Sequence, residues 1–180
     1  TTGDSTGLEA FEYTPASDRV DAIRWLISHN VLLFGTVGGE WKGDDLAPDT
    51  LPTLKRQSAF GSKHLQAVML SDTAFYFQRT GRRIQEIRFD YDSDSYMSRE
   101  VTLLAGHITG TGGIVDRGYQ QEPNPTLWCV RSDGEIAIMT FDRRQGIAGW
   151  SRFTTLGNFE SLAAITATSE DEVWVLVKRT

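Results

Sequence analysis

The chain has little cysteine, little positive charge and no long apolar run, and each scarcity excludes a class of protein. A single cysteine among 180 residues excludes an internal disulfide framework. Cys129 lies in the apolar run Leu127-Trp-Cys-Val130, which favours a small buried hydrophobe. No apolar run approaches the roughly 20 residues that cross a bilayer. Residues 1–7 also lack the basic and apolar parts of a signal peptide, so we expect no membrane partner.

Negative charge outweighs positive charge along the chain. There are 18 Lys and Arg against 24 Asp and Glu, which gives a net charge of -6. Tight nucleic-acid binding needs clustered Lys and Arg that release counterions, so this class is disfavoured. Loose contact with a polyanion that slides past is still compatible with this charge. The 39% hydrophobic and 23% charged content fits one soluble domain with a sizeable core.

A hairpin pattern recurs along the chain. An apolar run, a turn with glycine and an alternating run occur at residues 31–41, 73–87 and 126–139, and a half-copy occurs at 172–177. β-Branched and aromatic residues on both sides of such a turn predict β-hairpins. Recurrence about every 40 to 50 residues predicts propeller blades.

We therefore predict an all-β fold of β-propeller-like repeats, each a four-stranded antiparallel blade. Residues 1–19 form a polar segment with an edge strand near Phe11, and residues 20–180 form the propeller-like domain. Its units lie near residues 20–62, 65–98, 113–156 and 158–180. The last unit has two strands, so the ring is incomplete unless the segment around Phe11 supplies one. One short helix is expected at residues 98–105, between Ser98 as N-cap and Gly106.

Asp90, Asp92 and Asp94 form the one candidate metal site, for calcium. Carboxylates at alternate positions open many calcium loops, because these oxygens can converge on one hard cation. The pattern then fails, since the sixth position is Ser95 and the twelfth is Val101 rather than glycine and glutamate. A solvated acidic turn between two strands of a blade is the alternative.

Other chemical motifs are incomplete. His29, His64 and His107 lack the spacing of a helical zinc site. Residues 106–113 are glycine-rich but lack the lysine of a phosphate-binding loop. Residues 106–113 are therefore interpreted as a flexible linker between blades. We predict no enzyme activity, no catalytic residues and no cofactor.

Two basic clusters and five tryptophans are candidate contact residues. The basic clusters, residues 79–83 and the pair Arg143-Arg144, fall at hairpin ends. Each is interpreted either as a solvated turn or as a contact for carboxylates or phosphates. The tryptophans are interpreted as occupying equivalent places in successive units, which favours packing between blades over a sugar-stacking face. They are Trp25, Trp41, Trp128, Trp150 and Trp174.

A collinear series of motifs covers nearly the whole chain after Asp18. The most specific are Phe89-Asp-Tyr-Asp-Ser-Asp-Ser-Tyr96, Thr102-Leu-Leu-Ala-Gly-His-Ile108, Gly118-Tyr-Gln-Gln-Glu-Pro123 and Leu127-Trp-Cys-Val-Arg-Ser-Asp-Gly134. Further matches lie at residues 22–26, 33–41, 56–62, 77–84, 149–152 and 171–177. This series resembles the tail nozzle, or tail tubular protein B-like, component of short-tailed phages and prophages.

The resemblance implies a virion structural protein with a propeller-like core, assembled in the bacterial host cytoplasm. Several copies would form a ring that continues the DNA channel. The implied partners are other copies of the chain, neighbouring tail proteins such as the adaptor and the fibres, and DNA that passes without specific binding. Proteins of this family are much longer, and this chain lacks an initiator Met, so an excised domain is expected.

Two alternatives come from other functional classes. A carbohydrate-binding or depolymerising tail module needs an exposed tryptophan and a carboxylate pair, placed about 5 Å apart in retaining glycosidases. Asp44 and Asp45 are adjacent, which directs them to opposite sides of a strand. The other alternative is a generic protein-interaction propeller of cellular origin.

Overall fold

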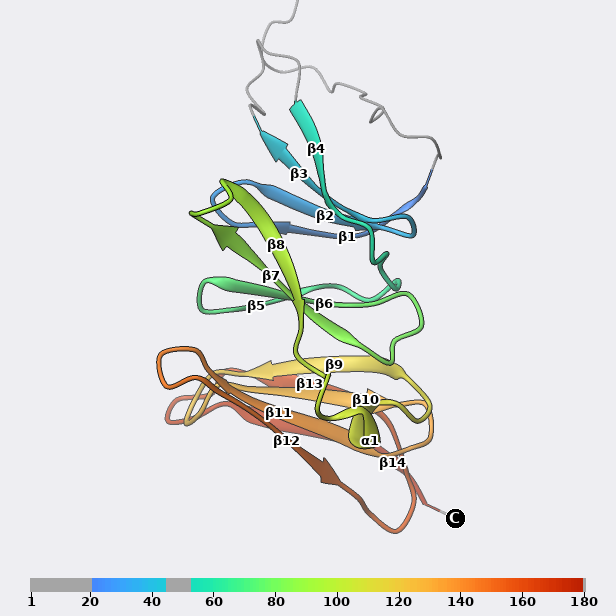
Figure 1. The fold of residues 1–180 in the computed structure, drawn as a ribbon. Helices are drawn as coiled ribbons and strands as arrows, with labels where there is room; N and C mark the ends of the chain where they lie inside the picture. The colour runs from blue at the N-terminus through green and yellow to red at the C-terminus, as the bar shows by residue number, and fades with distance from the viewer. Residues whose placement is uncertain (1–20, 45–52, 180) are drawn as a thin grey trace, which may run out of the picture.

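The computed structural model describes residues 21–44 and 53–179. Within them, fourteen strands form three four-stranded antiparallel sheets and one two-stranded hairpin, stacked in chain order (Figure 1). Blade 1 contains β1 (Ile23–Ser28), β2 (Leu32–Thr36), β3 (Glu40–Asp44) and β4 (Thr53–Ser58). Blade 2 contains β5 (Val68–Leu70), β6 (Thr73–Phe77), β7 (Ile84–Asp90) and β8 (Ser95–Glu100).

Blade 3 and a terminal hairpin complete the stack. Blade 3 contains β9 (Ile114–Gln120), β10 (Thr126–Arg131), β11 (Ile136–Asp142) and β12 (Ile147–Phe153). The terminal hairpin contains β13 (Asn158–Ile165) and β14 (Glu172–Lys178). In every sheet, strands that follow each other in the chain are neighbours. The expected architecture of propeller-like, four-stranded antiparallel blades with one short helix is confirmed, and the described residues form an open stack.

Local turn chemistry explains why these hairpins form. In the β10–β11 turn, Gly134 has a φ of +83°, which an L side chain rarely adopts, and its N–H donates to the carbonyl of Arg131 at 3.0 Å. The β6–β7 turn is built similarly, since Gly81 has a φ of +75° and its N–H donates to the carbonyl of Gln78 at 2.6 Å. Glycine at these positions therefore sets the strand register locally.

The core consists of three apolar layers between successive sheets. The blade 1–blade 2 layer contains Trp25, Leu33, Ala67, Ala74, Tyr76, Ile87 and Tyr96. The largest layer lies between blades 2 and 3 and includes Phe75, Phe77, Ile84, Ile114, Leu127, Cys129 and Met139. A smaller layer of Val130, Ile136, Phe159 and Leu162 lies between blade 3 and the terminal hairpin. Alternate residues of a strand face opposite sides, so an interior blade contributes to two layers.

The position predicted for the helix is wrong. Residues 98–100 belong to β8, where Ser98 pairs with Ile87 and accepts a hydrogen bond from the hydroxyl of Tyr76 at 3.1 Å. Helix α1 (Gly106–Thr109) begins at the residue expected to end the helix. The side chain of Ser98 is thus used by tertiary contacts rather than as an N-cap. Cross-strand pairing outweighs the local capping signal here.

One of the two adjacent aspartates, Asp44, lies at the end of β3. Gly43 and Asp44 lie in β3, where Asp44 forms an ion pair with Lys42 at 3.0 Å. Asp45 and the strand expected near Phe11 lie outside the described residues.

Candidate functional site

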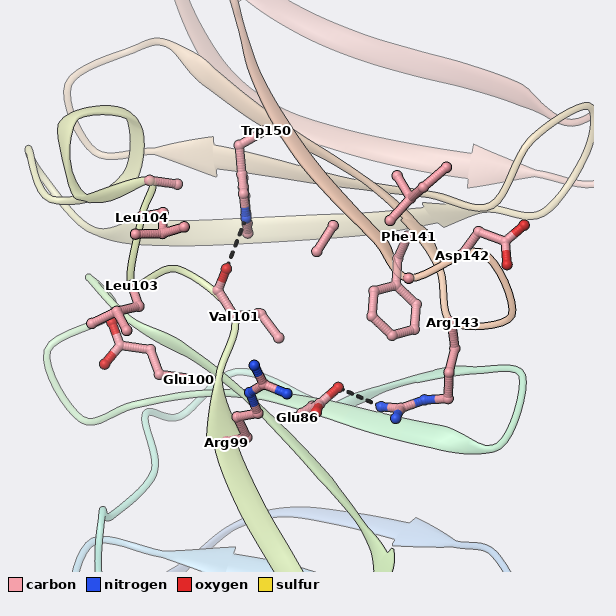
Figure 2. A pocket seen from close by; sticks show the side chains of 14 residues that line it. Glu86, Arg99, Glu100, Val101, Leu103, Leu104, Phe141, Asp142, Arg143 and Trp150 are labelled. Atoms are coloured by element: carbon pink, nitrogen blue, oxygen red, sulfur yellow. Dashed lines mark hydrogen bonds and ion pairs between the residues drawn. The ribbon is translucent and has the colours of Figure 1, made fainter.

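A cleft of about 420 Å³ opens between blades 2 and 3 (Figure 2). One wall comes from β7, β8 and the segment that leads to α1, and the other comes from β11, β12 and the turn between them. The indole N–H of Trp150 donates to the carbonyl of Val101 at 3.1 Å and ties the two walls together. We call this feature the interblade cleft.

Two leucines at the rim of the interblade cleft lie in solvent. Leu103 is 73% exposed and Leu104 is 92% exposed, and Ile147 on the opposite wall is 43% exposed. A turn in which the N–H of Ala105 donates to the carbonyl of Thr102 at 2.9 Å carries both leucines. Single exposed apolar residues are common, whereas neighbouring ones at the rim of a cleft are typical of a contact surface.

A partly buried ion pair lies at one side of the cleft. Arg143 of blade 3 donates to Glu86 of blade 2 at 2.6 Å, and the guanidinium of Arg143 lies 5.6 Å from the ring centre of Phe141. The side chain of Glu86 is 6% exposed, and a carboxylate so buried requires its cation. The expectation that Arg143 belongs to a solvated turn is therefore wrong, because this side chain links two blades.

Arg99 is a cation at the lining of the cleft. It is exposed, lies opposite Glu86 in the β7–β8 register, and forms no ion pair within the described residues. Glu100 beside it pairs with Arg83 at 3.4 Å. No serine, cysteine or histidine lines the described part of the cleft. The arrangement is therefore suited to binding an apolar group next to a negative charge.

A second polar cluster is buried between blades 1 and 2. Glu40 is fully buried and accepts hydrogen bonds from the hydroxyls of Ser58 and of Ser62, the latter at 2.9 Å. The indole of Trp25 donates to Ser62 at 2.7 Å. Burial raises the pKa of Glu40, although the hydroxyls lower it in part, and burial beside Glu40 raises the pKa of Tyr76. Hydrogen bonds of Ser58 with the hydroxyls of Tyr76 at 3.5 Å and of Ser98 at 3.3 Å join this cluster to blade 2.

The calcium candidates occupy the β7–β8 turn. Asp90 accepts hydrogen bonds from the amide and the hydroxyl of Ser93, at 3.2 and 2.7 Å. Asp94 adopts a positive φ of 46° within the same turn. Across residues 21–44 and 53–179, no group of three or more His, Cys, Asp or Glu side chains is arranged to hold a metal ion. Asp90, Asp92 and Asp94 are thus not brought together, and Asp90 closes the turn instead.

The tryptophans do not all occupy equivalent positions; only Trp128 and Trp174 match, as the third residues of the second strands β10 and β14. They lie on first, second, third and fourth strands of their sheets, on β1, β3, β10, β12 and β14. Trp25 and Trp41 are buried, whereas Trp174 is 62% exposed and its indole N–H donates to Glu172 at 2.9 Å. Packing between blades therefore explains Trp25 and Trp150 but does not explain Trp174.

The remaining residues singled out from the sequence do not line the interblade cleft. Cys129 is fully buried, as expected, and burial raises the pKa of its thiol. Residues 79–83 form the β6–β7 turn, and residues 106–113 connect blade 2 to blade 3 through α1. The three histidines lie on separate segments. The cleft residues Leu103 and Leu104 were not identified from the sequence, because a helix was expected there.

The fold defines the chain as a protein of β-propeller type, built from stacked four-stranded antiparallel blades. No protein-family model matches the chain, and no curated protein matches it. Among solved structures, the chain is similar to the WD40 domain of Pan2 from Neurospora crassa, with a TM-score of 0.47 and 9% identity. That match covers 79% of this chain and 41% of the other chain. In the part of the chain that the structure describes, no helix is long and apolar enough to span a membrane.

Proposed function

We propose that this chain is a protein-binding module of β-propeller type whose interblade cleft receives a segment of a partner protein. The observation that carries the proposal is the exposed pair Leu103 and Leu104 beside the cleft. Removing such apolar surface from water would favour association, at roughly 25 cal/mol per Å². We further propose that the module is architectural and catalyses no reaction.

The chemistry of the cleft specifies the partner segment. An apolar side chain of the partner would lie between Leu104 and Ile147, which form opposite rims. A carboxylate next to that side chain would meet Arg99, which forms no ion pair within the described residues. The expected partner segment therefore combines an apolar residue with an acidic one.

A peptide-binding measurement tests this proposal. Short synthetic peptides with leucine beside aspartate should bind, as measured by fluorescence anisotropy, and the same peptides with lysine in place of aspartate should bind more weakly. Leu104→Ser should weaken binding about five- to tenfold, because an exposed leucine would be buried in the complex. Arg99→Gln should remove the preference for aspartate.

Leu156→Ser is the matched control, since Leu156 is 91% exposed and does not line the cleft. This variant should bind as the unmodified chain does. Equal losses in Leu104→Ser and Leu156→Ser, or no binding of either peptide, would contradict the proposed role of the cleft.

A second candidate function places the module in the tail of a short-tailed phage. The collinear motifs that resemble the tail-nozzle family favour it, and the net charge of -6 suits a channel wall that does not hold DNA. The partners would then be further copies of the chain and neighbouring adaptor and fibre proteins. Mass spectrometry of phage particles purified from an induced culture should detect peptides of this chain in several copies per portal. Their absence from intact particles, with the protein present in the lysate, would exclude this setting.

A further inference from the structure

A second pocket, of about 440 Å³, lies between blades 2 and 3 and shares no lining residue with the interblade cleft. One wall is the end of β5 and the turn after it, with Met69 and Ser71. The other wall is Tyr119 of β9 and the loop 121–125 that joins β9 to β10. Each wall belongs to a blade that packs on a neighbour at both of its faces. We call this feature the loop pocket.

The loop 121–125 is held in place from the terminal hairpin. The carboxylate of Asp171 accepts hydrogen bonds from the backbone amides of Gln121 and Glu122, at 2.6 and 3.1 Å. The backbone amide of Asp171 donates in return to the carbonyl of Glu122 at 3.2 Å. The side-chain amide of Gln120 donates to the carbonyls of Glu122 and Asp171, at 3.1 and 3.2 Å. One wall of the loop pocket is therefore organised before any ligand arrives, which lowers the entropic cost of binding.

Two carboxylates lie near the phenol of Tyr119. Burial raises the pKa of Tyr119, and the negative charges of Asp171 and of Glu122 raise it further. Neither carboxylate forms an ion pair within the described residues. The half-buried ring of Tyr119 therefore lies beside two negative charges that have no cationic partner in this part of the chain.

This combination selects a cationic side chain. The face of an aromatic ring attracts a guanidinium or ammonium group, and a carboxylate accepts charge-assisted hydrogen bonds from it. Met69, Pro123 and Pro125 give the loop pocket apolar surface for the methylene stem of such a side chain. Arginine suits the pocket better than lysine, because a planar guanidinium can stack on the ring while its edge donates to a carboxylate.

The surrounding turns favour the approach of a cation. Successive strands of each blade are antiparallel, so the turns β5–β6, β7–β8, β9–β10, β11–β12 and β13–β14 lie at one end of the stack. A surface on which one sign of charge dominates concentrates ligands of the opposite sign. In these turns and at the strand ends beside them, the further carboxylates are Asp72, Asp90, Asp92, Asp94, Asp142, Glu170 and Glu172, and the cations are Arg143 and Arg144.

The given chain does not itself supply a cation to this pocket. Among the residues that the structure describes, no lysine or arginine lines the loop pocket, and outside them the sequence has only Arg19. Arg19 is two residues from Asp21, which lies against Gly38 in the β2–β3 turn, at the opposite end of the stack. Two residues span at most about 7 Å. A five-residue strand such as β6 spans about 17 Å, and the pocket lies at least one sheet spacing, about 10 Å, further along the stack.

We propose that the loop pocket binds an arginine side chain of a partner protein. The guanidinium would stack on Tyr119 and donate to the carboxylate of Glu122. Asp171 would add negative charge without moving, because its carboxylate is already fixed by two backbone amides. The loop pocket and the interblade cleft have no residue in common, so this inference does not depend on the proposed function of the cleft.

Titration of the intact chain with a small arginine compound tests the proposal. The probe is N-acetyl-arginine amide, and the control is N-acetyl-citrulline amide, whose side chain has nearly the same shape but no charge. In NMR titrations, the backbone amide signals of Gln121 and Glu122 should shift saturably, with a Kd on the order of 1 mM for so small a ligand. The citrulline compound should bind about tenfold more weakly or less, because it lacks the charge. Equal shifts with both compounds, or no shift in the loop 121–125, would overturn the proposal.

Two exposed carboxylates at this end of the stack provide matched variants. Glu122→Gln keeps the size of the side chain and removes its charge, and it should weaken arginine binding about fivefold. Asp92→Asn in the β7–β8 turn does not alter the pocket lining and should bind as the unmodified chain does. Leu104→Ser should also leave arginine binding unchanged, so a failure of the cleft function and a failure of this inference are distinguished. Equal losses in Glu122→Gln and Asp92→Asn would assign the attraction to the whole acidic end and overturn the proposed pocket.

Discussion

Replacing Gly35 with alanine should destabilise the contact between blades 1 and 2. Gly35 lies in β2, and a Cβ at this position would lie far inside van der Waals distance of the indole nitrogen of Trp25 and of the hydroxyl of Ser62. Both neighbours are almost fully buried, at 2% and 1% exposure. They therefore have little room to move, and the Trp25–Ser62–Glu40 chain of hydrogen bonds must be disturbed.

The expected cost has two components. Overpacking a well-filled core costs about 1 to 3 kcal/mol. Loss of the hydrogen bond from Trp25 to Ser62 adds about 1 kcal/mol. The free energy of unfolding should thus fall by about 2 to 4 kcal/mol. For a domain of this size, about 2 to 4 °C is lost per kcal/mol, so Tm should fall by about 4 to 16 °C.

Gly149→Ala is the control for the Gly35→Ala variant. Gly149 also lies within a strand, but no heavy atom lies within 4 Å of its added Cβ. Urea unfolding followed by far-UV circular dichroism should show Gly149→Ala within about 0.5 kcal/mol of the unmodified chain. If the two variants are equally stable, Gly35 does not support the packing of Trp25, and the reasoning fails.

Three further variants test the polar contacts between blades. Burial raises the pKa of Glu40 above its ordinary value of 4.5, so the folded state holds this proton more tightly. Relative to Glu40→Gln, the free energy of unfolding should therefore fall as pH rises from 4.5, by at most about 1.4 kcal/mol per pH unit in urea titrations. Trp150→Phe should lose about 1 kcal/mol in thermal unfolding, because the bond to Val101 is lost. Glu86→Gln should cost about 1 to 2 kcal/mol by leaving Arg143 unpaired, and a double-mutant cycle with Arg143→Gln should show coupling.

The hairpins were predictable because their signals are local. Asp133-Gly134 specifies a tight turn, and the alternation on each side specifies the faces of β10 and β11. Strands adjacent in sequence then pair as neighbours throughout the chain. The burial of Cys129 was predictable for the same reason, because its flanking residues are apolar.

The interblade contacts were not predictable from the sequence. Glu86 and Arg143 are 57 residues apart, and only the stacking of two blades brings them together. Ser98 was interpreted as an N-cap from its neighbours in sequence, whereas in the structure its hydroxyl accepts a hydrogen bond from Tyr76 across the sheet. Because a helix was expected at residues 98–105, Leu104 would have been assigned to a helix face rather than to the rim of a cleft.

Polar contacts join each sheet to the next along the stack. The buried Glu40 network joins blades 1 and 2, and the Glu86–Arg143 pair joins blades 2 and 3. The terminal hairpin is held to blade 3 at one end, where Asp171 accepts from the backbone amides of Gln121 and Glu122 at 2.6 and 3.1 Å, and within β13, where the amide of Leu162 donates to Asp116 at 3.0 Å. The buried carboxylates of Glu40 and Glu86 meet their partners in one arrangement only, so these contacts fix how blades 1, 2 and 3 lie on one another.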